Sequence, residues 1–209
     1  MSTKLILIRH GQTEWNLKKK YCGFTDIGLN ATGRAQVKKL QKKLENYKIN
    51  IIYSSDRKRA IQSAKILFNK REMKIIPDLK EVGFGIFEGL SYKQIMKKHG
   101  LLYSKWLSKP YSISLPKGES LKILEKRVSK AIRKIASLHK NKVIAIVCHG
   151  GVTSVFLNHI MKTKDFWGRV TDSASLTIVE FKNNKWKIIL FNDTKHLSRL
   201  RRDLTKLTK

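Results

Sequence analysis

Hydrophobic residues form two alternating kinds of pattern along the chain. Short, mostly apolar runs typical of buried strands lie at residues 4–8, 49–53 and 143–147, and a shorter run lies at 75–77. Between them, apolar residues recur at helical spacing. These stretches predict helices from Asn30 or Thr32 to about 46, at about 57–68, at 91–98, at 101–107, from a Ser120 cap to about 139, and at 152–161.

The last third of the chain carries a different pattern. Residues 176–181 and 186–191 alternate between apolar and polar positions on either side of the turn KNNK at 182–185, which predicts an antiparallel hairpin. Strands and helices alternate elsewhere, so we expect an α/β fold with a mainly parallel sheet in a three-layer α/β/α arrangement. No repeat, linker or break in composition divides the chain. We therefore expect one domain over residues 1–209, with a basic tail from about 195 that is either helical or frayed.

Charge is the most unusual feature of the composition. The chain has 45 Lys and Arg residues against 15 Asp and Glu, a formal net charge of +30. Such an excess raises the hypothesis of nucleic-acid binding. However, most of it is lysine on amphipathic segments such as residues 37–44 (VKKLQKKL), and no interleaved aromatic residues suggest base stacking. We expect a lysine-rich surface without a nucleic-acid partner, whose field would attract anionic substrates such as phosphate esters.

Membrane and export signals are not evident. No apolar run approaches the roughly 18 residues of a membrane helix, and residues 1–4 lead directly into the first strand without a signal peptide. Cys22 and Cys148 lie far apart and in no metal-binding spacing. This usage favours a cytoplasmic protein with two free thiols, although the sequence leaves a single disulfide open.

Two predicted strands end in the same way. Residues 5–11 (LILIRHG) and 144–150 (IAIVCHG) are both buried-type runs that finish in His-Gly. Ligands of open α/β sheets bind beyond the carboxyl ends of the strands, so we expect His10 and His149 to converge at one rim. The following glycines would let the backbone approach a ligand or turn tightly. The remaining histidines lie on helical or tail patterns and are expected on the surface or in packing roles: His99, His139, His159 and His196.

The neighbours of these histidines favour an anion over a metal. Zinc usually needs three or four protein ligands, and a fixed cation at Arg9 would repel it. Arg57 and Arg59 add positive charge after the second strand, near a helix start. Arginine forks and helix amino termini both favour phosphate. For one of these two arginines, we expect instead that the side chain is solvent-exposed in the first turn of the helix and does not bind the anion.

A family resemblance becomes specific here. Residues 9–16 (RHGQTEWN) resemble the signature of the histidine phosphatase superfamily, in its phosphoglycerate-mutase-like branch. Four further segments agree in the family's order: residues 54–64 (SSDRKRAIQSA), 79–89 (LKEVGFGIFEG), 116–120 (PKGES) and 147–151 (VCHGG). Ser63 is a mild departure, since threonine is frequent at this position. The resemblance spans nearly the whole chain and implies the phosphoglycerate-mutase-like fold.

The resemblance also implies roles for particular residues, with no metal and no cofactor. His10 would attack phosphorus as a neutral imidazole, kept neutral by nearby arginines, and Glu81 would serve as acid and base. Glu88 is the rival acid, while Glu14 and Glu119 are expected to be structural or at the substrate rim. The catalytic set is His10, Glu81, Arg9, Arg59 and His149. The substrate-binding set is Arg9, Gly11, Gln12, Thr13, Asn16, Arg59, Glu81 and Gly150.

Members of this superfamily either return the phosphoryl group to substrate or give it to water. Residues 89–116 leave little room for the lid of a mutase, so hydrolysis is expected. The run from 166 to 197 resembles α-ribazole-phosphatase-type members, which act in cobalamin biosynthesis, and this favours α-ribazole 5′-phosphate as the substrate. The alternatives are a phosphoglycerate mutase and an inactive, basic nucleic-acid-binding or regulatory protein. We expect a small phosphorylated substrate and no membrane partner, and leave a homodimer open.

Overall fold

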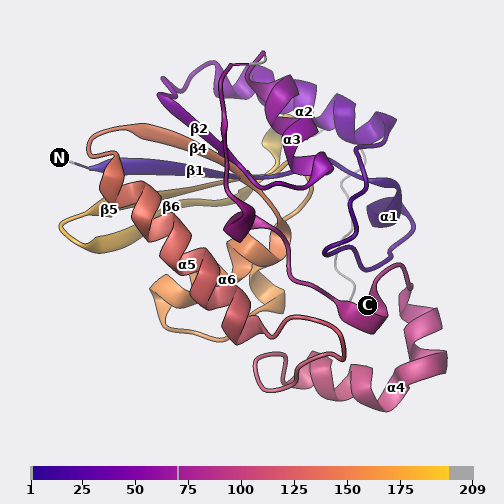
Figure 1. Ribbon diagram of the computed structural model, residues 1–209. Coiled ribbons are helices and arrows are strands. Elements are labelled where there is room, and N and C mark those ends of the chain that lie inside the picture. The colour runs from indigo at the N-terminus through magenta and orange to yellow at the C-terminus, as the bar shows by residue number, and fades with distance from the viewer. Residues whose placement is uncertain (1, 70, 198–209) are drawn as a thin grey trace.

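A six-stranded sheet forms the centre of the molecule. The computed structural model describes residues 2–69 and 71–197, and its strands lie in the order β3-β2-β4-β1-β5-β6 (Figure 1). Four strands are mutually parallel: β1 (Thr3–Arg9), β2 (Ile51–Ser54), β3 (Lys74–Ile75) and β4 (Val143–Cys148). The hairpin strands β5 (Leu176–Lys182) and β6 (Lys185–Asp193) continue the sheet, with β5 antiparallel to β1. The predicted parallel sheet and C-terminal hairpin are both confirmed.

Helices cover both faces of the sheet. Alternation along β1 sends Ile6 and Ile8 into one buried cluster and Leu5 and Leu7 into another. The first cluster lies under α2 (Ala31–Leu44) and α3 (Lys58–Leu67), and the second under α5 (Leu121–Leu138) and α6 (Gly150–Met161) (Figure 1). The three-layer arrangement expected from the sequence is confirmed.

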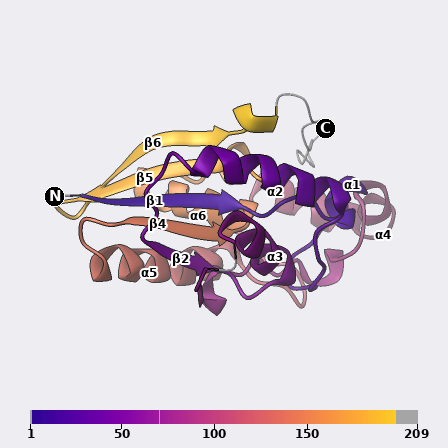
Figure 2. The same cartoon turned by 90° about the horizontal axis from the view of Figure 1, so that it is seen from above.

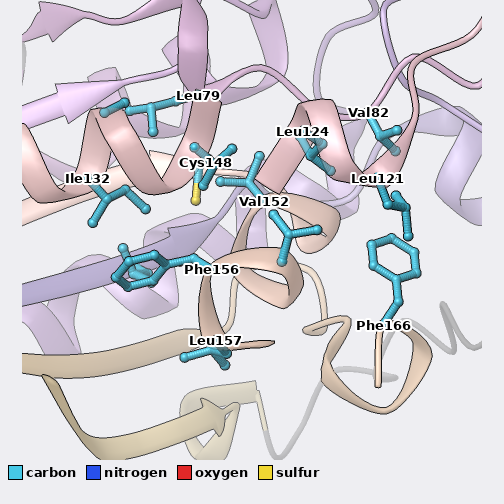
Figure 3. Packing of buried hydrophobic residues seen from close by; sticks show 14 of the residues in the cluster. Leu79, Val82, Leu121, Leu124, Ile132, Cys148, Val152, Phe156, Leu157 and Phe166 are labelled. Carbon is cyan, nitrogen blue, oxygen red and sulfur yellow. The ribbon is translucent and has the colours of Figure 1, made fainter. Parts of the chain in front are cut away.

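The longest helix, α5, shows how its sequence directs packing. The Ser120 hydroxyl accepts a bond from the Ile123 N–H at 3.3 Å and caps the helix, as predicted. Apolar residues at helical spacing, among them Leu124 and Ile132, then pack with Val152 and Phe156 of α6 in one buried cluster (Figure 3). Within the described part of the chain, no helix is long and apolar enough to span a membrane.

Several local predictions need correction. Residues 91–98 and 101–107 belong to one helix, α4 (Tyr92–Ser108), interrupted by non-helical dihedral angles at His99. The strand expected at 75–77 is only β3, because Pro77 begins a 3₁₀ turn (Pro77–Leu79). Further short turns that the pattern did not predict are α1 (Glu14–Leu17), Gly85–Phe87 and Trp167–Arg169. The 3₁₀ turn Lys195–Leu197 begins the tail that was expected to be helical or frayed. The rest of the predicted basic tail lies outside the described residues.

Two helices lie beyond the carboxyl end of the central strand. Figure 2 shows β1 pointing toward α1 and α4, on the side where residues 9–16 leave the sheet. Because β1, β2 and β4 are parallel, their carboxyl ends share this side. The sequence motifs that follow these strands are therefore brought to one rim.

Candidate active site

His10 and His149 meet at the rim of the sheet. Arg9 and Cys148 are register partners of the parallel strands β1 and β4, so the residues that follow them are neighbours. The two imidazole rings are edge-to-face, with centroids 5.1 Å apart, and both side chains are buried. The structure thus brings together the two histidines that the repeated strand ending singled out.

The His10 ring is held in a defined tautomer. Its Nδ1 lies 2.7 Å from the backbone oxygen of Gly11, and because a carbonyl only accepts, Nδ1 carries the proton. The lone pair is then on Nε2. Burial lowers the pKa of His10 well below 6.5, and the charges of Arg59 and Arg9 lower it further. The sequence argument named only the arginines, whereas burial has the larger effect. The geometry provides a neutral nitrogen nucleophile.

His149 is held by the opposite ring nitrogen. Its Nε2 lies 2.8 Å from the hydroxyl of Ser55, which follows β2, while the residue itself caps the amino end of α6. Burial lowers its pKa well below 6.5 as well, with Arg59 and His10 as further causes. A second neutral imidazole therefore lies beside the first, at a helix amino terminus.

Arg59 is the most deeply buried charge of the site. Its side chain is inaccessible to solvent and donates from Nη1 to the Thr25 carbonyl at 2.9 Å and from Nη2 to the Gly23 carbonyl at 2.7 Å. In the part of the chain that the structure describes, no carboxylate pairs with Arg59. A buried guanidinium bonded only to neutral carbonyls attracts an anion. Arg57, by contrast, is partly exposed and pairs with Asp56 at 2.6 Å, so it is the solvated one of the two arginines.

Arg9 contributes the second guanidinium. It follows the buried residues of β1, and its Nη1 donates to the Thr171 carbonyl, which fixes the group beside the cavity described below. The Cβ-less Gly150 leaves room for it, because a methyl group there would lie 3.3 Å from Nη1. Two arginines thus flank His10 from different elements.

The two candidate acids have different environments. Glu81 is nearly buried, and its carboxylate accepts the Val82 N–H at 2.9 Å and the Gly151 N–H at 3.0 Å. Glu88 instead accepts the N–H groups of Phe24 at 2.6 Å and Thr25 at 2.8 Å, together with the Thr25 hydroxyl. Glu88 therefore fixes the loop whose carbonyls hold Arg59. Only Glu81 reaches the cavity, a distinction that the sequence argument from the residues alone could not make.

A cavity of about 220 Å³ opens in front of His10. Its lining comprises Arg9, His10, Asn16, Lys19, Lys20, Tyr21, Cys22, Glu81, Phe84, Gly150, Gly151, Phe166, Trp167, Gly168 and Val170. Glu81 has the one carboxylate among these described residues. Arg9, Lys19 and Lys20 make one part of the lining cationic, and the aromatic side chains make another part apolar. Burial raises the pKa of the Cys22 thiol to about 11, so this thiol stays protonated at neutral pH.

The apolar wall of the cavity is attached to α4. The Trp167 indole N–H donates to the Leu107 carbonyl at 3.0 Å, and its ring meets Trp106 edge-on with centroids 4.9 Å apart. Sequence reasoning missed Lys19, Lys20 and the aromatic residues as a group. Nothing in their spacing reveals that segments 19–22 and 166–170 line one cavity together with His10.

Four predicted substrate-binding residues, Gly11, Gln12, Thr13 and Arg59, are not among those that line the cavity, and neither is the catalytic candidate His149. The backbone N–H groups of Gly11, Gln12 and Thr13 donate instead to Ser63 Oγ (3.1 Å), Gln36 Oε1 (2.9 Å) and Asn16 Oδ1 (3.0 Å). These bonds fix the segment after β1, so its amides serve the fold and are not free donors. Asn16 does line the cavity, and since its Oδ1 accepts from Thr13, its amide nitrogen is the end left for a ligand.

The other histidines and acidic groups have ordinary partners. His139 contacts the Tyr53 hydroxyl at 2.7 Å, and His159 pairs with Glu125 at 3.1 Å. Across the two described ranges, no group of three or more His, Cys, Asp or Glu side chains is placed to hold a metal ion. Both cysteines are free.

Known proteins share this fold and sequence pattern. Phosphoglycerate mutase-like protein 4 of Arabidopsis thaliana is 31% identical over 199 residues, covering 93% of this chain and 86% of that protein. The adenosylcobalamin/α-ribazole phosphatase of Escherichia coli strain K12 is 28% identical over 181 residues, covering 85% and 89%. The crystal structure of a phosphoserine phosphatase mutant from Entamoeba histolytica in complex with phosphoserine superposes with a TM-score of 0.85 at 29% identity, covering 93% and 99%.

The family assignment follows from these matches. Residues 5–194 match the profile of the histidine phosphatase superfamily (branch 1), so the match extends from β1 through the C-terminal hairpin. The predictions of the family, of its mixed α/β fold and of a phosphoric monoester hydrolase are confirmed. The chain belongs to the histidine phosphatase superfamily, branch 1.

Proposed function

We propose that this chain is a metal-independent phosphomonoesterase that hydrolyses a small phosphate ester through a phosphohistidine at His10. The observation that carries the proposal is the His10 tautomer: the bond from Nδ1 to the Gly11 carbonyl leaves a neutral Nε2 lone pair beside Arg9 and Arg59. A neutral imidazole attacks phosphorus, and fixed guanidinium groups stabilise the charge on the phosphoryl oxygens. Charge stabilisation and positioning are the main requirements of phosphoryl transfer.

The reaction divides into two displacements. In the first, Nε2 of His10 forms a bond to phosphorus while the ester P–O bond breaks, and the carboxylic acid of Glu81 gives its proton to the leaving alkoxide. In the second, Glu81 takes a proton from water, the water oxygen bonds to phosphorus, and the P–N bond to His10 breaks. Inorganic phosphate leaves, and Glu81 is again protonated. His149, neutral and adjacent, would donate or accept at a phosphoryl oxygen.

The shape and charge of the cavity bear on the substrate. Phe84, Phe166 and Trp167 offer apolar walls beyond the phosphate position, and these suit a flat organic group. A phosphoserine ammonium would find one carboxylate, Glu81, in the described lining, and that group is already used in proton transfer. This supports α-ribazole 5′-phosphate, the favoured substrate, over phosphoserine. The free thiols at Cys22 and Cys148 suit the proposed cytoplasmic location.

A phosphate-release screen tests the proposal. The purified chain would be assayed in excess EDTA with α-ribazole 5′-phosphate, phosphoserine, 3-phosphoglycerate, sugar phosphates and nucleotides. We expect metal-independent release, with the highest kcat/KM on α-ribazole 5′-phosphate. Loss of all activity in EDTA would refute the mechanism, and a higher kcat/KM on phosphoserine would refute the substrate assignment but leave the mechanism intact.

The same screen separates the two alternatives. A phosphoglycerate mutase would interconvert phosphoglycerates in the presence of a bisphosphoglycerate cofactor without net phosphate release. No described residue of α4 lines the cavity, so this region supplies no wall close to the reacting groups. A nucleic-acid-binding protein on an inactive fold would release no phosphate and would bind DNA or RNA with a steep salt dependence. The set of His10, Arg59, Glu81 and His149 in one site argues against that alternative.

A further inference from the structure

The side chain of Arg127 lies behind the segment that carries Glu81. Arg127 projects from α5. Its guanidinium donates to three backbone carbonyls of this segment, those of Asp78 at 2.7 Å, Lys80 at 2.8 Å and Glu81 at 3.1 Å. Three backbone carbonyls within four residues thus converge on one guanidinium. Such an arrangement fixes the path of the backbone at the residue that the proposed mechanism uses as acid and base.

Glu119 completes the arrangement. Both of its carboxylate oxygens accept from Arg127, at 2.7 Å from Nε and 2.7 Å from Nη2, in a bidentate pair. Its own backbone N–H donates to the Gly83 carbonyl at 2.8 Å, on the far side of Glu81. Glu119 and Arg127 therefore hold the segment from residue 78 to residue 83 at both ends, and their charges compensate each other at 9% and 13% exposure.

Apolar contacts anchor the same segment without defining its orientation. Leu79 and Val82 flank Glu81 and are buried in one cluster with Leu121 and Leu124 of α5 (Figure 3). Hydrophobic contacts are non-directional, so they keep the segment on the helix but do not fix the rotation of its peptide planes. The directional part of the restraint comes from the hydrogen bonds of Arg127. The Glu81 carboxylate then reaches the Gly151 N–H at the start of α6.

The geometry points to Arg127, locked by Glu119, as the positioning residue for Glu81 in both proton transfers. This inference rests on the proposed function. The guanidinium of Arg127 is engaged by three backbone carbonyls and by both oxygens of Glu119, so it acts through Glu81 and not on the substrate. Lysine cannot replace it fully, because one ammonium group cannot reach three carbonyls and both carboxylate oxygens with the fork of a guanidinium.

The test compares leaving groups. We would measure kcat and kcat/KM for Arg127→Met, Arg127→Lys and Glu119→Gln with an alkyl phosphate and with p-nitrophenyl phosphate, whose leaving group needs little protonation. The matched control is Arg133→Met, since Arg133 is an exposed arginine on the same helix. Glu81→Gln and the double variant Glu81→Gln/Arg127→Met complete the set. Thermal unfolding is recorded for each.

A positioning role predicts a specific pattern. We expect Arg127→Met to lower kcat/KM for the alkyl phosphate by about 10- to 100-fold, with Arg127→Lys between it and the wild type. For p-nitrophenyl phosphate, kcat/KM should change less than threefold, and a burst of nitrophenol should appear because hydrolysis of the phosphohistidine still needs Glu81. In the Glu81→Gln background, Arg127→Met should have no further effect, because the group it positions is already absent.

Other outcomes overturn the inference. Equal losses on both substrates, together with a lower unfolding temperature, would assign Arg127 a purely structural role. Multiplicative losses in the double variant would place its action outside Glu81. If Glu81→Gln itself leaves alkyl phosphate hydrolysis unchanged, the proposed function fails. Normal activity in Arg127→Met alone, with Glu81→Gln impaired, refutes only the positioning role.

Discussion

β1 and β4 are each followed by His-Gly, yet the two histidines are bound through opposite nitrogens. His10 donates from Nδ1 to the adjacent Gly11 carbonyl, which leaves Nε2 with its lone pair. His149 uses Nε2 for Ser55, a residue from a third strand end. The difference shows that a repeated motif in two parallel strands need not give two equivalent groups. In the proposed mechanism, the partner of each ring leaves one histidine as the nucleophile and the other to assist at the phosphoryl group.

Two glycines near the histidines, Gly11 and Gly151, differ as well. A Cβ on Gly11 would lie 2.5 Å from the Gly33 carbonyl, so this glycine lets α2 pack against the segment after β1. A Cβ on Gly151 would lie 2.3 Å from Glu81 Oε1, so that glycine makes room for the acid. Of the two glycines that directly follow the histidines, Gly150 lines the cavity, whereas Gly11 does not and packs against α2.

The largest expected effect comes from removing the nucleophile. His10→Ala should lower kcat by at least about 10⁴-fold, because no other group can form the covalent intermediate. Steady-state phosphate release in EDTA measures this loss, and acid-quenched labelling with a ³²P-phosphate ester should detect no phosphoenzyme. Full activity in this variant would refute the role of His10 as the nucleophile.

Replacing the second histidine should be less severe. We expect His149→Asn to lower kcat by about 10²- to 10³-fold, in the range found when one charge-stabilising donor is removed, while the phosphoenzyme still forms. Rapid-quench labelling measures the formation of that intermediate directly. If the loss matched that of His10→Ala and no phosphoenzyme were detected, the assignment of different roles would be wrong.

Replacing Gly11 should mainly affect stability, whereas replacing Gly151 should mainly affect activity. Gly11→Ala should lower the free energy of unfolding by about 1 to 3 kcal/mol, because its Cβ meets backbone that cannot move aside easily. Gly151→Ala should change stability less, since the clashing atom is the end of a side chain, but should lower kcat by about 10-fold or more because Glu81 is displaced. Urea unfolding and kinetics on both variants provide the check. Reversed effects would contradict the assigned roles.

The last expected effect concerns pH. The pKa values of His10 and His149 are lowered in the folded protein, so below about pH 6.5 the unfolded chain binds protons that the folded chain does not. Stability should therefore fall as pH drops from 7 to 5, by up to about 1.4 kcal/mol per pH unit for each histidine. His149→Asn should flatten this dependence in urea unfolding. An unchanged slope would exclude His149 as a contributor.

The sheet and the main helices can be predicted from the sequence, because the spacing of apolar residues reflects the period of each element and the faces that it buries. Residues 5–8 and 143–147 are apolar at every position, which is typical of strands covered on both faces, and both are central. The sequence predicts two helices where the structure has the single, kinked α4, because helical spacing fails at His99. Short turns such as α1 have too few residues to show a period.

The candidate site was predicted unevenly, for a physical reason. His10, His149 and Arg59 follow strands or begin a helix, so the topology alone brings them together. Glu81 could be separated from Glu88 only once the partners of each carboxylate were known. Arg127 carries no local signal, because its importance comes from contacts with residues more than 45 positions away. Long-range contacts of this kind have no period in the sequence.

The attachment of Trp167 to Leu107 and Trp106 has an evolutionary consequence. The proposed reacting groups come from the ends of β1 and β4, from α3 and from the segment between β3 and α4, whereas the apolar wall is braced by α4. Mutations that accumulate in α4 would therefore move the wall and leave the phosphate-binding groups unchanged. Selection could thus retune which ester enters while the chemistry is inherited intact, so that substrate preference diverges faster than mechanism.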